Sequence, residues 1–63
     1  MNYFEILEAA LTLQPRLVCK ISTPPANTAV WYGDTIDGEE YVLQPWIAYD
    51  FSVNEYIIGY QAV

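Results

Sequence analysis

The stretch GDTIDGEEYV at residues 33–42 contains four of the eight carboxylates of the chain and no lysine or arginine. The four acids are Asp34, Asp37, Glu39 and Glu40. Carboxylates this close in sequence could bind a metal ion, act as an acid–base pair, or form a negatively charged surface for a positively charged partner. Each of these chemistries makes a different demand on the surrounding residues.

A calcium loop of the EF-hand type does not fit the stretch. Such a loop has acids at its first, third and fifth positions, glycine at the sixth and glutamate at the twelfth. With Gly38 in the sixth position, Gly33 and Thr35 occupy two acidic positions and Gln44 occupies the last. The chain has no histidine and a single cysteine, so a zinc site of Cys and His ligands is also excluded. We expect no metal and no cofactor.

Catalysis is not indicated either. A glycosidase-type carboxylate pair can come from distant strands, but a small hairpin offers little cleft in which one pKa could be raised above the other. Cys19 has no histidine or acidic base near it in sequence, and we expect it to be a small core residue. The sequence therefore predicts a protein that is not an enzyme. The acids could also serve only to keep an exposed turn soluble.

Length and composition predict one small domain spanning residues 1–63. A chain of this size buries only about 60% of its surface and usually needs a disulfide, a metal or a partner subunit for stability. A single cysteine excludes an intramolecular disulfide, which leaves oligomerisation. With 54% hydrophobic and 16% aromatic residues, the chain is too apolar for a disordered acidic tail.

The charge balance predicts a basic partner. The net charge is −6, and Arg16 and Lys20 are the only cations, which argues against direct binding to nucleic acid or to an anionic membrane. The chain has no apolar run long enough for a membrane span and no positively charged start before an apolar stretch. We expect a cytoplasmic protein.

The first half of the chain predicts a helix and a strand. Asn2 resembles a helix cap, apolar residues follow at helical spacing, and Pro15 closes the segment 2–14. In residues 16–22 apolar and polar residues alternate, which is typical of a strand with Cys19 pointing inward. The prolines of TPPANT, residues 23–28, predict a loop.

Residues 28–45 predict a hairpin. Asp37-Gly38 is a strong signal for a two-residue type I′ turn, which would place Tyr32 opposite Leu43. In that register Val30, Tyr32, Ile36, Tyr41 and Leu43 share one face. Trp31 falls on the other, more polar face. It is either an anchor for a partner or a side chain covered by a loop or a terminal helix.

The last segment fits two interpretations. Residues 46–51 alternate and either extend the hairpin strand or begin another. Ser52 and Glu55 have capping-box spacing, and Phe51 and Tyr56 take the flanking apolar positions, which predicts a short C-terminal helix. Tyrosine and isoleucine favour strands, so a further strand is the alternative. The expected fold is α+β: an N-terminal helix, a three-stranded antiparallel meander and a short C-terminal helix.

The N-terminal helix, the acidic hairpin DGEEYVL and the capped terminal segment, in so small and acidic a chain, resemble phage-encoded inhibitors of bacterial defence, anti-CRISPR proteins in particular. The resemblance implies action without catalysis, in some members by presenting carboxylates where a nuclease expects nucleic-acid phosphates. It implies no individual site residue.

The leading hypothesis is a non-enzymatic acidic protein that occupies a basic, nucleic-acid-binding groove of a larger protein. Its expected binding residues are Trp31, Asp34, Asp37, Glu39 and Glu40. The alternative is a homo-oligomeric structural subunit that hides its apolar residues against copies of itself. A small hydrolase with two carboxylates is the third hypothesis.

Overall fold

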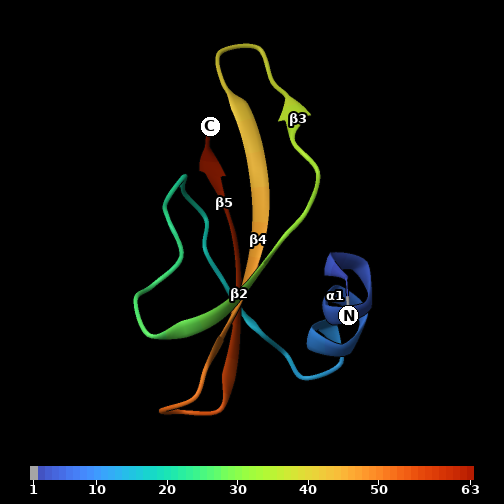
Figure 1. Ribbon diagram of the computed structural model, residues 1–63, viewed down its shortest axis with the longest axis vertical. Coiled ribbons are helices and arrows are strands. Elements are labelled where there is room, and N and C mark those ends of the chain that lie inside the picture. The colour runs from blue at the N-terminus through green and yellow to red at the C-terminus, as the bar shows by residue number, and fades with distance from the viewer. Residues whose placement is uncertain (1) are drawn as a thin grey trace.

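The computed structural model describes residues 2–63 as one helix and a five-stranded mixed sheet (Figure 1). The elements are α1 (Tyr3–Leu11), β1 (Arg16–Leu17), β2 (Thr28–Tyr32), β3 (Ile36–Asp37), β4 (Val42–Asp50) and β5 (Glu55–Ala62). The strand order is β1-β5-β4-β2, and β3 pairs with the other end of β4. Only β1 and β5 are parallel. The predicted three-stranded meander with a C-terminal helix is therefore wrong.

Helix α1 begins at the cap expected from the sequence. The side chain of Asn2 accepts a hydrogen bond from the backbone N–H of Glu5 at 3.0 Å. Ile6 and Ala10 are buried on one side of the helix, one turn apart. After the helix, Gln14 adopts a positive φ of 52°, which turns the chain before Pro15. The helix thus presents one narrow apolar side to the sheet.

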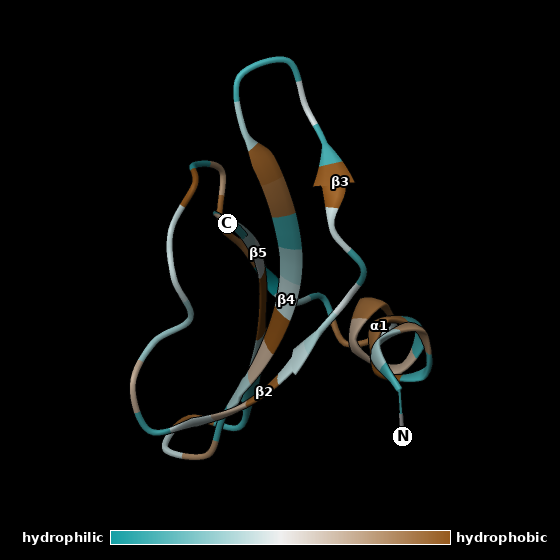
Figure 2. Ribbon diagram, turned by 45° about the horizontal axis from the view of Figure 1, so that its top comes forward, coloured by the Kyte–Doolittle hydropathy of each residue, from teal (hydrophilic) through white to brown (hydrophobic). Residues whose placement is uncertain are grey.

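The core has two layers, one on each face of β4. We call the face that packs against α1 the front and the opposite face the back. Ile47 joins Ile6 and Ala10 in the front cluster, whereas Trp46 and Ala48 lie in the back cluster with Ile57. Figure 1 shows α1 and the connection between β1 and β2 on opposite sides of the sheet. Both faces of β4 are therefore covered, and hydrophobic residues line much of this strand (Figure 2).

The back layer is organised around one tryptophan. Trp46 is fully buried, and its indole N–H donates to the backbone carbonyl of Ser22 at 2.9 Å. Directly opposite on β5 lies Gly59, where an added Cβ would come within 2.5 Å of the indole Cζ2. Only glycine at this position leaves room for the ring, and the ring in turn holds the β1–β2 connection against the sheet.

Residues 55–62 form a strand, not the predicted helix. Every residue from Glu55 to Ala62 pairs with β4, and the two-residue alternation places Tyr56 in the front cluster and Ile57 in the back cluster. Ser52 and Asn54 lie in the connection between β4 and β5, where Asn54 has a positive φ of 52°. The pairing and burial along all of β5 outweigh the capping signal.

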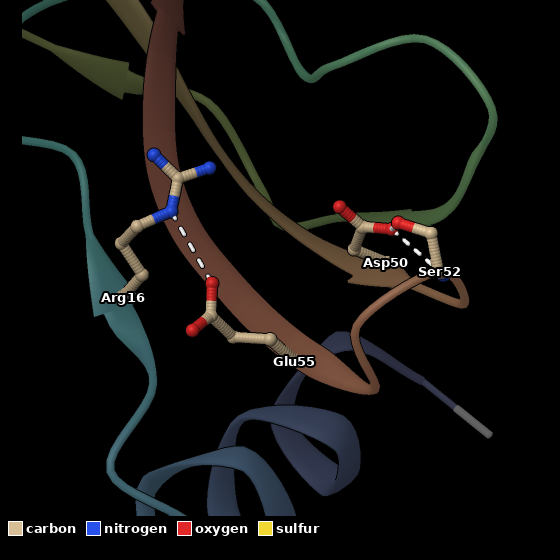
Figure 3. A network of polar contacts seen from close by, with 4 residues as sticks. All are labelled: Arg16, Asp50, Ser52 and Glu55. Carbon is tan, nitrogen blue, oxygen red and sulfur yellow. Dashed lines mark hydrogen bonds and ion pairs between the residues drawn. The ribbon is translucent and has the colours of Figure 1, made fainter.

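The turn between β4 and β5 is fixed by Asp50 (Figure 3). Its carboxylate accepts hydrogen bonds from the hydroxyl of Ser52 at 2.6 Å and from the backbone N–H of the same residue at 2.9 Å. These hydrogen bonds, the hydroxyl first, lower the pKa of the Asp50 carboxyl below its ordinary value. Ser52 therefore acts as a turn residue rather than as a helix cap.

We predict that Gly59→Ala lowers the free energy of unfolding by about 1 to 3 kcal/mol, because the new methyl group overpacks the buried indole. Urea denaturation measures the effect. In a Trp46→Leu background the same substitution should cost clearly less, since the two side chains interact. Equal costs in both backgrounds would show that the Trp46 ring does not require a glycine there.

We predict that Ser52→Ala destabilises the domain more at neutral pH than in acid. The folded pKa of Asp50 lies below the unfolded value, so its carboxylate contributes stability above about pH 4, and this contribution is lost as the pH falls through the folded pKa. Urea midpoints at about pH 7 and about pH 2 test this. Ser52→Thr, which keeps a hydroxyl, is the control. A gap between wild type and Ser52→Ala that does not change with pH would contradict the prediction.

Candidate functional site

Three of the four acids of the opening stretch lie on the hairpin formed by β3 and β4, and Asp34 lies in the connection that leads into it from β2. Asp37 pairs with Val42, and the backbone N–H of Gly38 donates to the carbonyl of Tyr41 at 2.8 Å. Glu39 and Glu40 therefore occupy the corner of the turn. Figure 1 shows this hairpin projecting beyond the other strands, and Figure 2 shows that its end is hydrophilic. The structure thus places Asp37, Glu39 and Glu40 together at one end of the molecule, with Asp34 before β3.

The predicted type I′ turn at Asp37-Gly38 is wrong. Neither of these residues has a positive φ, which that turn requires. The observed register pairs Tyr32 with Trp46, not with Leu43. The sequence signal is local, whereas this register is set by the pairing of β2 along the buried part of β4.

A bulge separates β2 from β3. Gly33 lies opposite Pro45, and Ile36 lies opposite Leu43. The segment between β2 and β3 therefore contains one more residue than the matching part of β4. The proline explains the break, because it has no N–H to donate to the carbonyl of Gly33. The side chain of Gln44 donates to that carbonyl instead, at 3.3 Å. The bulge moves Ile36 to the front face and leaves Asp34 exposed.

All four hairpin acids are exposed, and among residues 2–63 no ion pair involves them. The chain's two cations lie elsewhere in the sequence. Arg16 is 3.4 Å from the carboxylate of Glu55, at the end of the sheet opposite the hairpin (Figure 3). Lys20 follows β1 and is exposed. The charged side chains of the hairpin are therefore all negative.

An apolar groove of about 510 Å³ lies on the front face beside α1. Its lining includes Tyr3, Leu17, Cys19, Ile36, Leu43 and Tyr60. The short helix covers only part of the front face, and the groove occupies the part nearer the hairpin, since Ile36 and Leu43 belong to β3 and β4. Partial burial beside the groove raises the pKa of Tyr3. Apolar and acidic surfaces thus adjoin one another.

Cys19 is exposed at this groove and is not the core residue that the sequence predicts. The strand expected over residues 16–22 is regular only at Arg16–Leu17, and it is Val18 that packs into the back cluster. Beyond it, the backbone N–H of Ser22 donates to the carbonyl of Tyr60 at 3.0 Å. The alternation correctly groups Leu17 with Cys19, since both line the groove, but this part of the front face is not covered, and Leu17 is itself 64% exposed.

Trp31, expected as an anchor, packs against the front cluster under α1. This side chain is half-buried, and the cluster that it contacts includes Ile6 and Ala10 of α1, so a terminal helix covers part of it. Its role as an anchor for a partner stays a prediction. The aromatic residues left exposed near the hairpin are Tyr32 and Tyr41, of which 49% and 53% are exposed. The hairpin register expected from the sequence puts both on a single apolar face and does not predict their exposure. The large share of apolar residues in so short a chain was the signal that some must remain exposed.

Within residues 2–63 no three metal-ligating side chains of His, Cys, Asp or Glu gather at one place. The same residues include no helix that is long and apolar enough to cross a membrane. Comparison with known protein families, curated protein sequences and solved structures gave no significant match. The function must therefore be argued from the hairpin and the groove themselves.

We predict that Cys19 reacts fully with thiol reagents in the folded protein, because its side chain is exposed. A polarity-sensitive fluorophore attached there should report the apolar groove through emission at a shorter wavelength than in the unfolded protein. Leu43→Asn, which makes the groove more polar, should reduce this difference. A thiol that reacts only after denaturation, or emission that is the same in folded and unfolded protein, would contradict the described groove.

Proposed function

We propose that the protein is a non-enzymatic acidic binding protein that docks its β3–β4 hairpin against a basic surface of a larger protein. The observation that carries the proposal is the acidic hairpin: Asp37, Glu39 and Glu40 are exposed at its end, Asp34 is exposed in the bulge before β3, and among residues 2–63 none of the four forms an ion pair. Charge complementarity of this kind raises association rates and specificity more than affinity.

The apolar groove beside the hairpin supports the proposal with a second type of contact. Ile36 is 59% exposed and lies on the same hairpin as the acids. Burying such side chains against a partner supplies the hydrophobic contribution that exposed charges lack. Tyr41, at the turn, adds an aromatic side chain of the type enriched in interfaces. A partner would therefore meet a surface that is acidic at its tip and apolar along one side.

The partner class follows from the chemistry of the acids. Surfaces dense in lysine and arginine are those that bind the phosphates of nucleic acid. We therefore name a nucleic-acid-binding groove as the site that the hairpin occupies, which makes the protein an inhibitor of that partner. The function resembles that of anti-CRISPR proteins, and of the features behind that resemblance the small size, the acidity, the N-terminal helix and the acidic hairpin remain after the correction of the fold.

A competition experiment with two matched variants tests the proposal. Tagged protein captures its partner from a lysate of bacterial cells, and duplex nucleic acid is added to the complex. We predict that nucleic acid releases the partner, because both occupy the same groove. Glu39→Gln with Glu40→Gln should slow association and flatten its salt dependence, since steering by exposed charges is screened beyond about 8 Å at physiological ionic strength.

Glu5→Gln with Glu8→Gln is the matched control, because it raises the net charge of −6 by the same two units at exposed sites on α1. This variant should bind as the wild type does. If both variants slow association equally, overall charge rather than the hairpin is responsible. A captured partner that nucleic acid does not displace would contradict the groove assignment.

A further inference from the structure

Strand β2 forms an outer edge of the sheet, and one side of its backbone has no partner. The N–H of Gly33 donates to the carbonyl of Pro45, so in the antiparallel register Ala29 and Trp31 also point their backbone groups toward β4. Those of Val30 and Tyr32 therefore point outward. Among residues 2–63, no backbone hydrogen bond outside the strand pairing reaches the outward groups of these two residues.

Within Thr28–Tyr32 this edge lacks the charged residues and prolines by which proteins protect such strands. Exposed edges usually carry charged side chains or proline, or are covered by another segment. The sequence TAVWY of β2 has neither a charge nor a proline. The charge-free stretch extends from Ile21 to Gly33, and the bulge that follows limits the free edge to Thr28–Tyr32.

The opposite edge of the sheet is different. There β1 and the residues after it cover β5, with the N–H groups of Val18 and Ser22 donating to the carbonyls of Ile58 and Tyr60. Strands β1 and β3 are also paired on one side only, but each has two residues, so among residues 2–63 the longest edge strand is β2.

We propose that β2 is the interface through which two copies of this chain pair, antiparallel about Val30, into one continuous sheet. The two-fold axis would place Thr28 opposite Tyr32 of the second copy and Val30 opposite Val30 of the second copy. These three residues carry the outward backbone groups, so each would exchange hydrogen bonds with its counterpart. The strand is complementary to itself in this register.

The charge distribution favours this edge over the rest of the surface for contact between two copies. Two chains with a net charge of −6 repel one another over most of their surfaces, and the neutral stretch 21–33 is where they can approach without facing acids at close range. Tyr32, which is 49% exposed, would also bury apolar surface against the partner strand. A chain this small gains stability from oligomerisation. The pairing goes beyond the proposed function, since the hairpin acids take no part in it.

The register is tested by two matched charge variants and by the mass in solution. In the paired edge, position 28 faces position 32 of the other copy. Thr28→Lys with Tyr32→Lys would set like charges opposite one another, whereas Thr28→Lys with Tyr32→Glu would create two complementary pairs. We expect wild type to be a dimer in sedimentation equilibrium. The like-charge variant should have a dissociation constant at least about tenfold higher than the opposite-charge variant.

Hydrogen exchange of the wild type gives a second measurement that needs no substitution. The amides of Val30 and Tyr32 should be protected in concentrated protein and exchange faster on dilution, while the amide of Trp31, which faces β4, should be protected at both concentrations. A wild type that stays monomeric at its highest soluble concentration would overturn the proposal. So would equal dissociation constants for the two charge variants, or exchange at Val30 that is independent of concentration.

Discussion

The packing of the Trp46 indole against Gly59 is the contact on which the rest of the structure depends. It matches the register of β5 to that of β4, because the ring of Trp46 lies over Gly59, where an added Cβ would come within 2.5 Å of the indole. The indole N–H also holds the carbonyl of Ser22, so the long connection from β1 crosses the back of the sheet and delivers the chain to β2. With the back closed in this way, a helix of nine residues is enough to cover part of the front.

Pro45 has an equally wide effect, although it sits in the most buried strand, where proline is normally absent. Pro45 has no N–H to donate to the backbone carbonyl of Gly33. The opposite strand forms a bulge there, and the side chain of Gln44 donates a hydrogen bond to that carbonyl. After the bulge, the alternation of residues between the two faces of the sheet is shifted by one position, so Ile36 lies on the front face and Asp37 on the back face. The apolar groove and the acidic turn thus lie on a segment whose register is offset from that of β2, and this offset brings Ile36 beside Leu43 on the front face.

Helix α1 could be predicted because its signals are local: the Asn2 cap, the helical spacing of apolar residues and Pro15. The C-terminal segment could not, because the spacing of Ser52 and Glu55 fits both a capped helix and a turn followed by a strand, and only pairing with β4 decides between them. The predicted hairpin register was wrong for the same reason, because the pairing of β2 with β4 and not the local turn signal sets it. The position of the acids at an exposed turn followed from sequence, but the covering of Trp31 and the exposure of Cys19 and Tyr41 depend on long-range packing.

The position of β5 has a consequence for the order in which the protein is built. It follows all the other described strands in sequence, yet it lies between β1 and β4, and Arg16 of β1 pairs with Ile57 of β5. A contact between residues so far apart closes a large loop, which is slow because the chain entropy is lost before the contact is made. Until β5 has been synthesised, β1 has no strand to pair with, and the part of Trp46 that contacts Gly59 in the folded protein remains uncovered. Folding of the sheet must therefore wait until the residues of β5 have left the ribosome.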